Sequence, residues 1–317
     1  MVATLMLTSC MKDDMDDCAL LLQLRFVYNM QQIDGFSREA NHVCVSVFDA
    51  DKKWVADYEA DNIYGQQNFT MRLPMLDPGR YTFVVRANGT EETHPMADFA
   101  WTKLQTGSSP DDLQGRLPRN DDGVVNHRLN NLLVGVQETE ISGASSTITI
   151  NMLKCTNQLR VILMPAQASQ SLKSEDFDIR IEGSSGWLAY DGSIYQSDSV
   201  TYHPYLQVLE SDPSLSRAGG EVDHAVVADL STSRIMDGSN SRLVIYHRTT
   251  QSEVLNINLP WFLSLQAIGE HQATWSNQEY LDRQSEFAMT FFIDGSTWMH
   301  TRIIVNGWVL SLQDIGL

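Results

Sequence analysis

Apolar and polar residues alternate in short runs along most of this chain. The runs that alternate, or that are rich in β-branched and aromatic residues, are 43–48, 81–85, 148–152, 159–164, 177–181, 243–246, 289–293 and 303–309. Successive side chains of a strand point to opposite faces, so such runs are typical of strands with one face in a core. β-branched and aromatic residues also favour strands. The chain is therefore predicted to be mostly β.

Turn-forming residues separate these runs. Asp49-Ala50-Asp51-Lys52-Lys53 stands between two predicted strands, and Asp77-Pro78-Gly79 stands just before another. Helical signals are limited to 94–104 and 260–268, where Pro260 suits a first helical turn. Many short strands joined by turns favour β-sandwiches over a parallel α/β sheet. The predicted fold class is all-β with few short helices.

The length and charge of the chain limit its organisation and its partners. With 317 residues, of which 43% are hydrophobic and 20% charged, the chain is long enough for two globular domains. A full set of predicted strands lies on each side of position 145, so we expect an N-terminal β-sandwich domain at 19–145 and a C-terminal one at 146–317. The formal net charge of -18 would repel phosphates, so no nucleic-acid partner is predicted.

Cys10 separates an apolar run, residues 1–9, from an acidic run, residues 11–17. Leu7-Thr8-Ser9-Cys10 fits the bacterial lipobox, in which small residues precede a cysteine whose thiol carries a diacylglycerol. Each buried acyl methylene contributes about 0.8 kcal/mol, so two or three acyl chains hold a protein firmly on a membrane. Residues 1–18 are interpreted as a truncated lipoprotein signal and acidic tether, with Cys10 as the lipidation site. The alternative is a free cysteine in a disordered tail.

The other cysteines are Cys18, Cys44 and Cys155. A disulfide between Cys18 and Cys44 would suit an exported protein. The alternative for Cys44 and Cys155 is burial in strands. The three lie far apart, with no CxxC pair and no zinc-type spacing with histidine, so no metal site is predicted.

Motifs of enzyme active sites are absent from the sequence. It contains no GxSxG, HExxH, GxxxxGK[ST] or strand-linked GxGxxG, and its eight histidines are scattered singly. No catalytic residue and no cofactor is predicted, and the protein is predicted not to be an enzyme.

Segments spread over most of the chain together resemble one protein family. Near the C-terminus they are Gln278-Glu279-Tyr280-Leu281-Asp282-Arg283-Gln284, the run 287–292, Trp298 and the run 303–309, and earlier ones are 24–28, 34–36, 43–49, 76–83, 156–161 and 230–236. In this order they resemble the fimbrillin-associated anchor proteins of Bacteroidales. The order of the whole set is far more specific than any one segment.

The resemblance implies a lipoprotein with two tandem transthyretin-like β-sandwich domains that anchors or caps fimbriae at the surface of the cell outer membrane. Lys12-Asp13-Asp14 is similar to the acidic signal that sends such lipoproteins to the outer leaflet. The implied partners are the fimbrial shaft subunits and, through the lipid, the outer membrane. The implied role is structural.

The resemblance also implies that subunits join by strand addition, in which an extended segment of one subunit completes the sheet of the next. Because an anchor keeps its own first strand, here 19–28, its groove would stay filled and it would donate a strand. The segment 303–317 is predicted to carry or border the contact, with Ile303, Val305, Trp308 and Val309 as partner-strand residues. The alternative is that 303–309 is an internal core strand and Trp308 a core aromatic.

Two other functions fit part of the sequence. A pilus-tip adhesin that binds a glycan or a host protein would use exposed aromatic residues, for which the candidates are Trp54, Trp101, Trp187 and Trp275. A surface glycan-processing enzyme would need two carboxylates that converge in one cleft.

Overall fold

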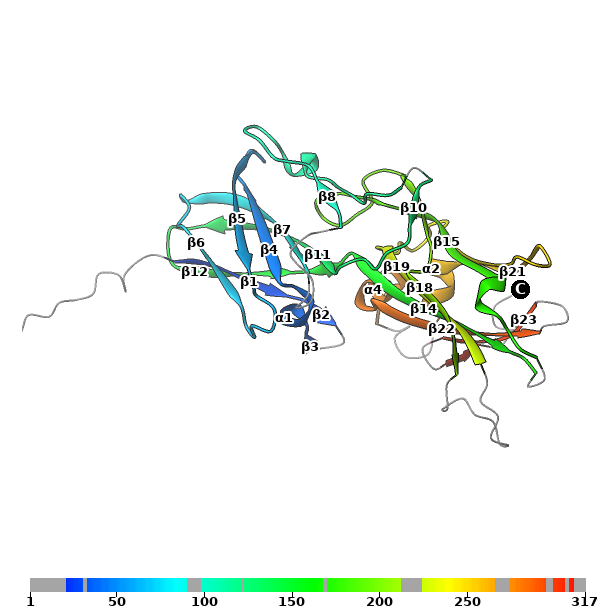
Figure 1. The fold of residues 1–317 in the computed structure, drawn as a ribbon. Helices are drawn as coiled ribbons and strands as arrows, with labels where there is room; N and C mark the ends of the chain where they lie inside the picture. The colour runs from blue at the N-terminus through cyan, green and yellow to red at the C-terminus, as the bar shows by residue number, and fades with distance from the viewer. Residues whose placement is uncertain are drawn as a thin grey trace, which may run out of the picture.

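A computed structural model describes residues 21–30, 33–89, 98–120, 122–167, 170–211, 224–265, 274–294, 299–305 and 308–310. It shows two lobes side by side, each built mainly of strands (Figure 1). The helices among the described residues are short. The predicted all-β fold with few short helices is confirmed.

Two sheets form the first lobe, and their strands are as follows. The smaller sheet has the order β12 (Ser146–Asn151), β1 (Leu22–Val27) and β6 (Thr70–Leu73). The larger has the order β13 (Leu153–Lys154), β11 (Leu132–Ile141), β7 (Gly79–Asn88), β4 (His42–Phe48) and β5 (Trp54–Asp61). Leu24 and Phe26 of the smaller sheet share a buried cluster with Val45 and Phe83 of the larger one, which makes this lobe a sandwich.

Strand β1 occupies the middle of the smaller sheet. It runs parallel to β12 from the pair Leu22 and Ser146 to the pair Val27 and Asn151, so each residue of β1 faces one of β12. On its other side β1 runs antiparallel to β6. The first strand of the described chain is therefore held from both sides by segments that follow it.

Strand β4 is buried on both faces. Val43, Val45 and Val47, predicted to share one face, have no exposed surface and pack in the first core. On the opposite face Phe48 packs with Leu113, which comes from a later connecting segment. This segment covers the outside of the larger sheet.

The second lobe is also built from two sheets. One has the order β10 (Val124–Val125), β17 (Ser199–Tyr202), β15 (Phe177–Ser185), β20 (Arg242–His247) and β21 (Ser252–Asn258). The other has the order β18 (Leu206–Ser211), β19 (His224–Ser233), β14 (Thr156–Pro165), β22 (Glu286–Asp294), β23 (Met299–Val305) and β24 (Trp308–Leu310). Both sheets contribute buried side chains to one large core, for example Ile179 from β15 and Met289 from β22.

The chain between β7 and β11 extends from the first lobe into the second. In it β8 (Ala100–Trp101) and β9 (Gly115–Arg116) join β16 (Trp187–Leu188) in a small sheet. Side chains of this segment that lie in the core of the second lobe are Phe99, Leu117, Val125 and Leu129. The segment is therefore part of the second core although strands of the first lobe lie on either side of it in the sequence. The predicted division at residue 145 stays a prediction, and β12, which follows it directly, pairs within the first lobe.

The remaining elements are short. They are the hairpin β2 (Asn29–Met30) and β3 (Ile33–Asp34), the helices α1 (Phe36–Glu39), α2 (Leu259–Ser264) and α4 (Asn277–Arg283), and the 3-10 turns η2 (Pro110–Asp112) and η3 (Ser174–Asp176). The predicted helix at 260–268 is confirmed over 260–264 in α2, where the Asn258 side chain accepts the Trp261 N–H at 2.9 Å, and residues 266–268 lie outside the described residues. None of the helices that the structure describes is long and apolar enough to cross a membrane.

The helix predicted at 94–104 is wrong over its described part, because Ala100 and Trp101 form β8. They pair with β9, and the Trp101 ring lies so close to Gly115 that a Cβ there would be 2.7 Å from a ring carbon. This contact with a distant glycine outweighs the local helical preference. By contrast, the predicted turn at 49–53 is confirmed: the Asp49 carboxylate accepts the backbone N–H groups of Asp51 and Lys53 at 3.0 and 2.8 Å.

Candidate functional site

The predicted partner-strand residues lie together in the hairpin of β23 and β24. Val305 pairs with Trp308, and Ile304 pairs with Val309. β23 is an inner strand, because it also pairs with β22, whereas β24 pairs with β23 alone among the described strands. Ile303 and Val305 therefore lie on an inner strand, and Trp308 and Val309 lie on an edge. An edge strand offers backbone N–H and C=O groups to a further strand.

Strand β22 holds this hairpin against the core. Along β22, Phe287, Met289, Phe291 and Ile293 are all buried, and the residues between them are exposed or half-buried. The Phe291 ring stacks on Phe262 of α2 with ring centroids 6.2 Å apart. The β24 edge is thus attached, through β23, to a strand whose inner face lies in the core of the second lobe.

The opposite edge of the same sheet is β18. It pairs with β19 alone among the described strands, and its Leu206 and Leu209 side chains are 40% and 46% exposed. The six-stranded sheet therefore has an edge at β18 and an edge at β24. They are candidate surfaces for strand addition.

Helix α4 lies just before β22 and faces the first lobe. The Ser276 side chain caps it by accepting the Glu279 N–H at 3.1 Å. Arg283 pairs with Glu279 one turn away at 2.8 Å and lies over the Trp275 ring, 4.7 Å from its centroid. The cap and these contacts explain why seven residues form a stable helix here.

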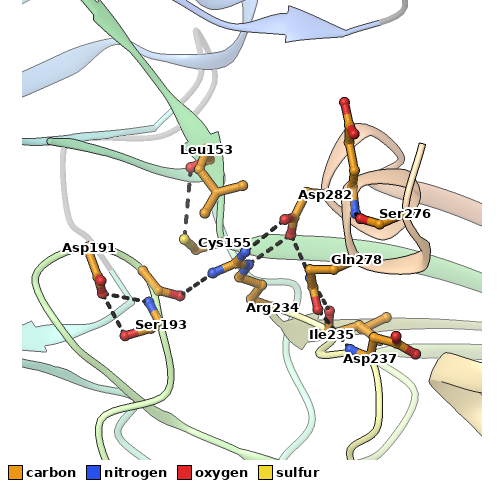
Figure 2. A network of polar contacts seen from close by, with 12 residues as sticks. Leu153, Cys155, Asp191, Ser193, Arg234, Ile235, Asp237, Ser276, Gln278 and Asp282 are labelled. Carbon is orange, nitrogen blue, oxygen red and sulfur yellow. Dashed lines mark hydrogen bonds and ion pairs between the residues drawn. The ribbon is translucent and has the colours of Figure 1, made fainter. Parts of the chain in front are cut away.

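A largely buried ion pair joins α4 to the end of β19 (Figure 2). The Arg234 guanidinium donates two hydrogen bonds, 2.8 and 2.7 Å long, to the two carboxylate oxygens of Asp282. A third, of 3.0 Å, goes to the Gly192 carbonyl. Burial opposes the charge of Arg234, but the hydrogen bonds and charge of Asp282 outweigh it and raise the arginine pKa above its ordinary value.

Gln278 extends this network along the helix (Figure 2). Its amide donates to the Asp282 carboxylate at 2.9 Å, and its carbonyl oxygen accepts the Asp237 N–H at 2.8 Å. Both Arg234 and Asp282 belong to runs that carry the family resemblance, 230–236 and 278–284. The family resemblance therefore marked both runs in the sequence, but the sequence did not show that they contact each other.

A cavity of about 550 Å³ lies where α4 faces the first lobe. Val27 and Tyr28 at the end of β1 line one side, and Gln278 and Asp282 line the other. Nearby, Lys154 of β13 donates to Glu39 of α1 at 2.9 Å, and its side chain is 4% exposed. This ion pair holds β13 to α1 within the first lobe, and β13 is a strand of that lobe that contacts α4.

The cysteines are placed as follows. Cys44 and Cys155 are buried and form no disulfide with a described residue, and burial raises the pKa values of their thiols to about 11 and about 12. Both are therefore protonated and unreactive near neutral pH. Cys10 and Cys18 lie outside the described residues, so lipidation at Cys10 and a Cys18 to Cys44 disulfide stay predictions.

The four tryptophans considered for an adhesin are all half-buried and lie at three separate places. Trp54 and Trp101 pack on one cluster beside Phe48, and Arg86 lies over the Trp101 ring at 5.2 Å. Trp187 lies under Arg116, and Trp275 lies under Arg283. Each of the four rings thus packs on neighbouring side chains, and the four do not form one common surface. Among the described residues no group of three His, Cys, Asp or Glu side chains is arranged to hold a metal ion.

Comparison with known proteins connects this architecture to fimbriae. The family model described as fimbrillin-A associated anchor proteins Mfa1 and Mfa2 matches residues 15–314. No curated protein matches the chain by sequence.

Several solved structures share the fold over nearly the whole chain. A candidate polysaccharide-binding protein from Bacteroides thetaiotaomicron is 28% identical, with a TM-score of 0.80, over 94% of this chain and 100% of its own. A candidate adhesin from the same species is 25% identical, with a TM-score of 0.81, over 93% of this chain and 98% of its own. The fimbrial anchor protein Mfa2 from Porphyromonas gingivalis is 15% identical, with a TM-score of 0.64 over 92% of this chain and 99% of its own, and this likeness concerns the fold alone.

Proposed function

Because this chain belongs to the family of fimbrillin-A associated anchor proteins Mfa1 and Mfa2, we propose that it is a surface lipoprotein that anchors fimbriae to the outer membrane. The family match over residues 15–314 is the observation that carries the fimbrial role. The family is described by anchoring rather than by a reaction, in keeping with a non-enzymatic protein. Such an anchor has a membrane end and a fimbrial end.

The membrane end is proposed to be a diacylglycerol on Cys10. Leu7-Thr8-Ser9-Cys10 fits the lipobox, and β1 starts at Leu22. The eleven residues between Cys10 and β1 reach at most about 40 Å when fully extended. The first lobe would therefore stay close to the membrane surface, with the second lobe available to the fimbria.

The fimbrial end is proposed to be the β24 edge, which would donate or receive a strand of the neighbouring subunit. Support comes from the pairing of β24 with β23 alone among the described strands. In the first lobe β1 already fills the middle of its own sheet, so that position is not open to a partner strand. Main-chain hydrogen bonds would hold the junction, and side chains at alternate positions would select the partner.

Replacing Cys10 with alanine tests the membrane end. Without the thiol no thioether can form, so the protein is expected in the soluble fraction, with fimbriae released into the medium. Ser9→Gly keeps a small residue beside the cysteine and serves as the matched control, with membrane attachment unchanged. Fractionation with immunoblotting measures both variants. Retention of the Cys10→Ala protein on the membrane would contradict lipidation at this residue.

Placing a lysine on each edge tests the fimbrial end. A charged lysine on an edge strand disfavours the approach of another strand. Val309→Lys on β24 is therefore expected to reduce the number of attached fimbriae at least tenfold, whereas Leu209→Lys on β18 leaves it unchanged. Electron microscopy of whole cells gives the count, and immunoblotting confirms equal surface levels of the two variants. If Leu209→Lys reduced the number of attached fimbriae and Val309→Lys did not, the contact would be assigned to β18 instead.

A further inference from the structure

A second cavity, of about 640 Å³, is lined by residues of the first lobe alone. We call it the α1 pocket and define it by residues 34–39, residues 66–69 and Phe26. Helix α1 lines one side, and the loop between β5 and β6 lines the other. Neither the proposed lipid site nor the β24 edge uses it.

Backbone contacts hold the two sides of the α1 pocket together. The Gly65 N–H donates to the Ser37 carbonyl at 2.7 Å, which ties the loop to the helix. Asn62, Gly65 and Asn68 all have left-handed φ angles, of 60°, 75° and 57°. Asparagine and glycine are the residues that tolerate this conformation, so the sequence suits the loop. The pocket is therefore formed before any ligand arrives, which lowers the entropic cost of binding.

Aromatic rings form the apolar part of the α1 pocket. Phe26 and Phe36 are 2% and 3% exposed, with ring centroids 5.3 Å apart. Phe69 is half-buried and stacks on Phe26 at 6.1 Å with an interplanar angle of 19°. The buried rings hold Phe69 in place, and its remaining surface lines the pocket. A fixed aromatic ring with an accessible surface is a platform for the C–H groups of a flat ligand.

Polar side chains that make no hydrogen bond within the described part of the chain line the rest of the α1 pocket. Ser37, Arg38, Gln67 and Asn68 line the pocket, and none of their side chains hydrogen-bonds within the described part of the chain. Together they provide a hydroxyl, two primary amides and a guanidinium, which means several donors and acceptors in one place. An apolar ligand would bury these groups unsatisfied, which is costly. A ligand rich in hydroxyl groups would satisfy them.

The charges in the α1 pocket are largely compensated. Asp34 Oδ1 accepts the backbone N–H groups of Tyr28 and Phe36, both at 3.1 Å. Glu39 is paired with Lys154 at 2.9 Å and accepts from Asn131 at 2.7 Å. Arg38 is left as a charged donor without an ion-pair partner among the described residues. The formal net charge of -18 on the whole chain disfavours a polyanionic ligand.

We infer that the α1 pocket binds a neutral oligosaccharide. A pyranose ring stacks on Phe69 through its C–H face, and Arg38, Gln67 and Asn68 hydrogen-bond its neighbouring hydroxyl groups. Concave sites with an apolar platform and a few well-placed polar groups are typical of small-ligand binding. The inference goes beyond anchoring, because it gives the first lobe a recognition role that the fimbrial contact does not require.

Calorimetric titration of the purified full chain with neutral tetrasaccharides of glucose, mannose, galactose and xylose tests this inference. At least one probe is expected to bind, and Phe69→Ala and Arg38→Ala are each expected to weaken that binding at least tenfold. Arg38 is exposed, and its side chain makes no hydrogen bond or ion pair in the described part of the chain, so its replacement is expected to leave the fold intact. Tyr195→Ala, which removes a 45% exposed aromatic ring on the second lobe, is the matched control and leaves the affinity unchanged.

Three results would overturn the inference: none of the probes binds, binding survives both pocket substitutions, or Tyr195→Ala weakens binding as much as they do. The proposed anchoring is tested separately in the same variants. Cells that carry Arg38→Ala are expected to keep their attached fimbriae. Loss of sugar binding with fimbriae retained therefore supports the pocket without bearing on the anchor.

Discussion

Replacing Asp282 with alanine is expected to lower the free energy of unfolding by about 3 kcal/mol, because it leaves a largely buried arginine without its counter-ion. The Arg234 side chain is 12% exposed and that of Asp282 is 18% exposed. Alanine leaves two guanidinium donors without acceptors in a site with little access to water. Urea denaturation followed by tryptophan fluorescence measures the loss.

Helix α4, which carries Asp282, also offers a control for this prediction. Glu279 and Arg283 form an ion pair on the same helix, but their side chains are 41% and 31% exposed. Glu279→Ala is therefore expected to cost less than about 0.5 kcal/mol. Replacing both partners of the buried pair, Arg234→Met with Asp282→Leu, is expected to restore most of the stability. Equal losses for Asp282→Ala and Glu279→Ala would show that burial does not distinguish the two pairs.

Replacing Phe291 with alanine is expected to lower the free energy of unfolding by about 3–5 kcal/mol, through lost burial and a cavity in the second core. Phe291 has no exposed surface and stacks on Phe262. The next residue, Phe292, points to the outer face of the sheet, where it is only partly buried. Phe292→Ala is therefore expected to cost about 1 kcal/mol. Thermal and urea denaturation of both variants measure the difference.

This pair of neighbours also tests the register of β22. A shift by one residue would exchange the two faces of the strand. If Phe292→Ala proved the more damaging substitution, the register of β22 against β14 would be wrong, and with it the placement of the β23 and β24 hairpin. A larger cost for Phe291→Ala supports the described pairing.

Alternation in the sequence predicted the strands well where one face lies in a core. It did not predict that β4 is buried on both faces, because Leu113, which covers the second face, lies some seventy residues further along the chain. The same kind of distant contact explains the wrong helix at 94–104, where Trp101 packs on Gly115. Patterns within a short stretch of sequence reflect residues that are close along the chain. The burial of β4 on both faces and the strand at Trp101 depend on contacts with residues that are distant in the sequence.

The candidate sites were predictable to different degrees. The run 303–309 was identified from the family resemblance, and the structure divides it between an inner strand and an edge strand. The α1 pocket was not identified, because residues 34–39 and 66–69 are separated in the sequence by β4 and β5 and meet only in the fold. Gln67 and Asn68 become candidate binding residues only because the structure places their loop opposite α1.

The parallel pairing of β1 with β12 has a mechanical consequence for a tethered protein (Figure 1). Tension between a membrane-bound N-terminus and a fimbria on the second lobe would pull β1 toward its own start. The same tension would pull β12 toward its end, where the chain continues into the second lobe. The two strands would then slide past each other in shear, so the hydrogen bonds along β1 would share the load and break together rather than unzip one by one. In a protein tethered in this way, the sheet that holds β1 would resist the pulling force.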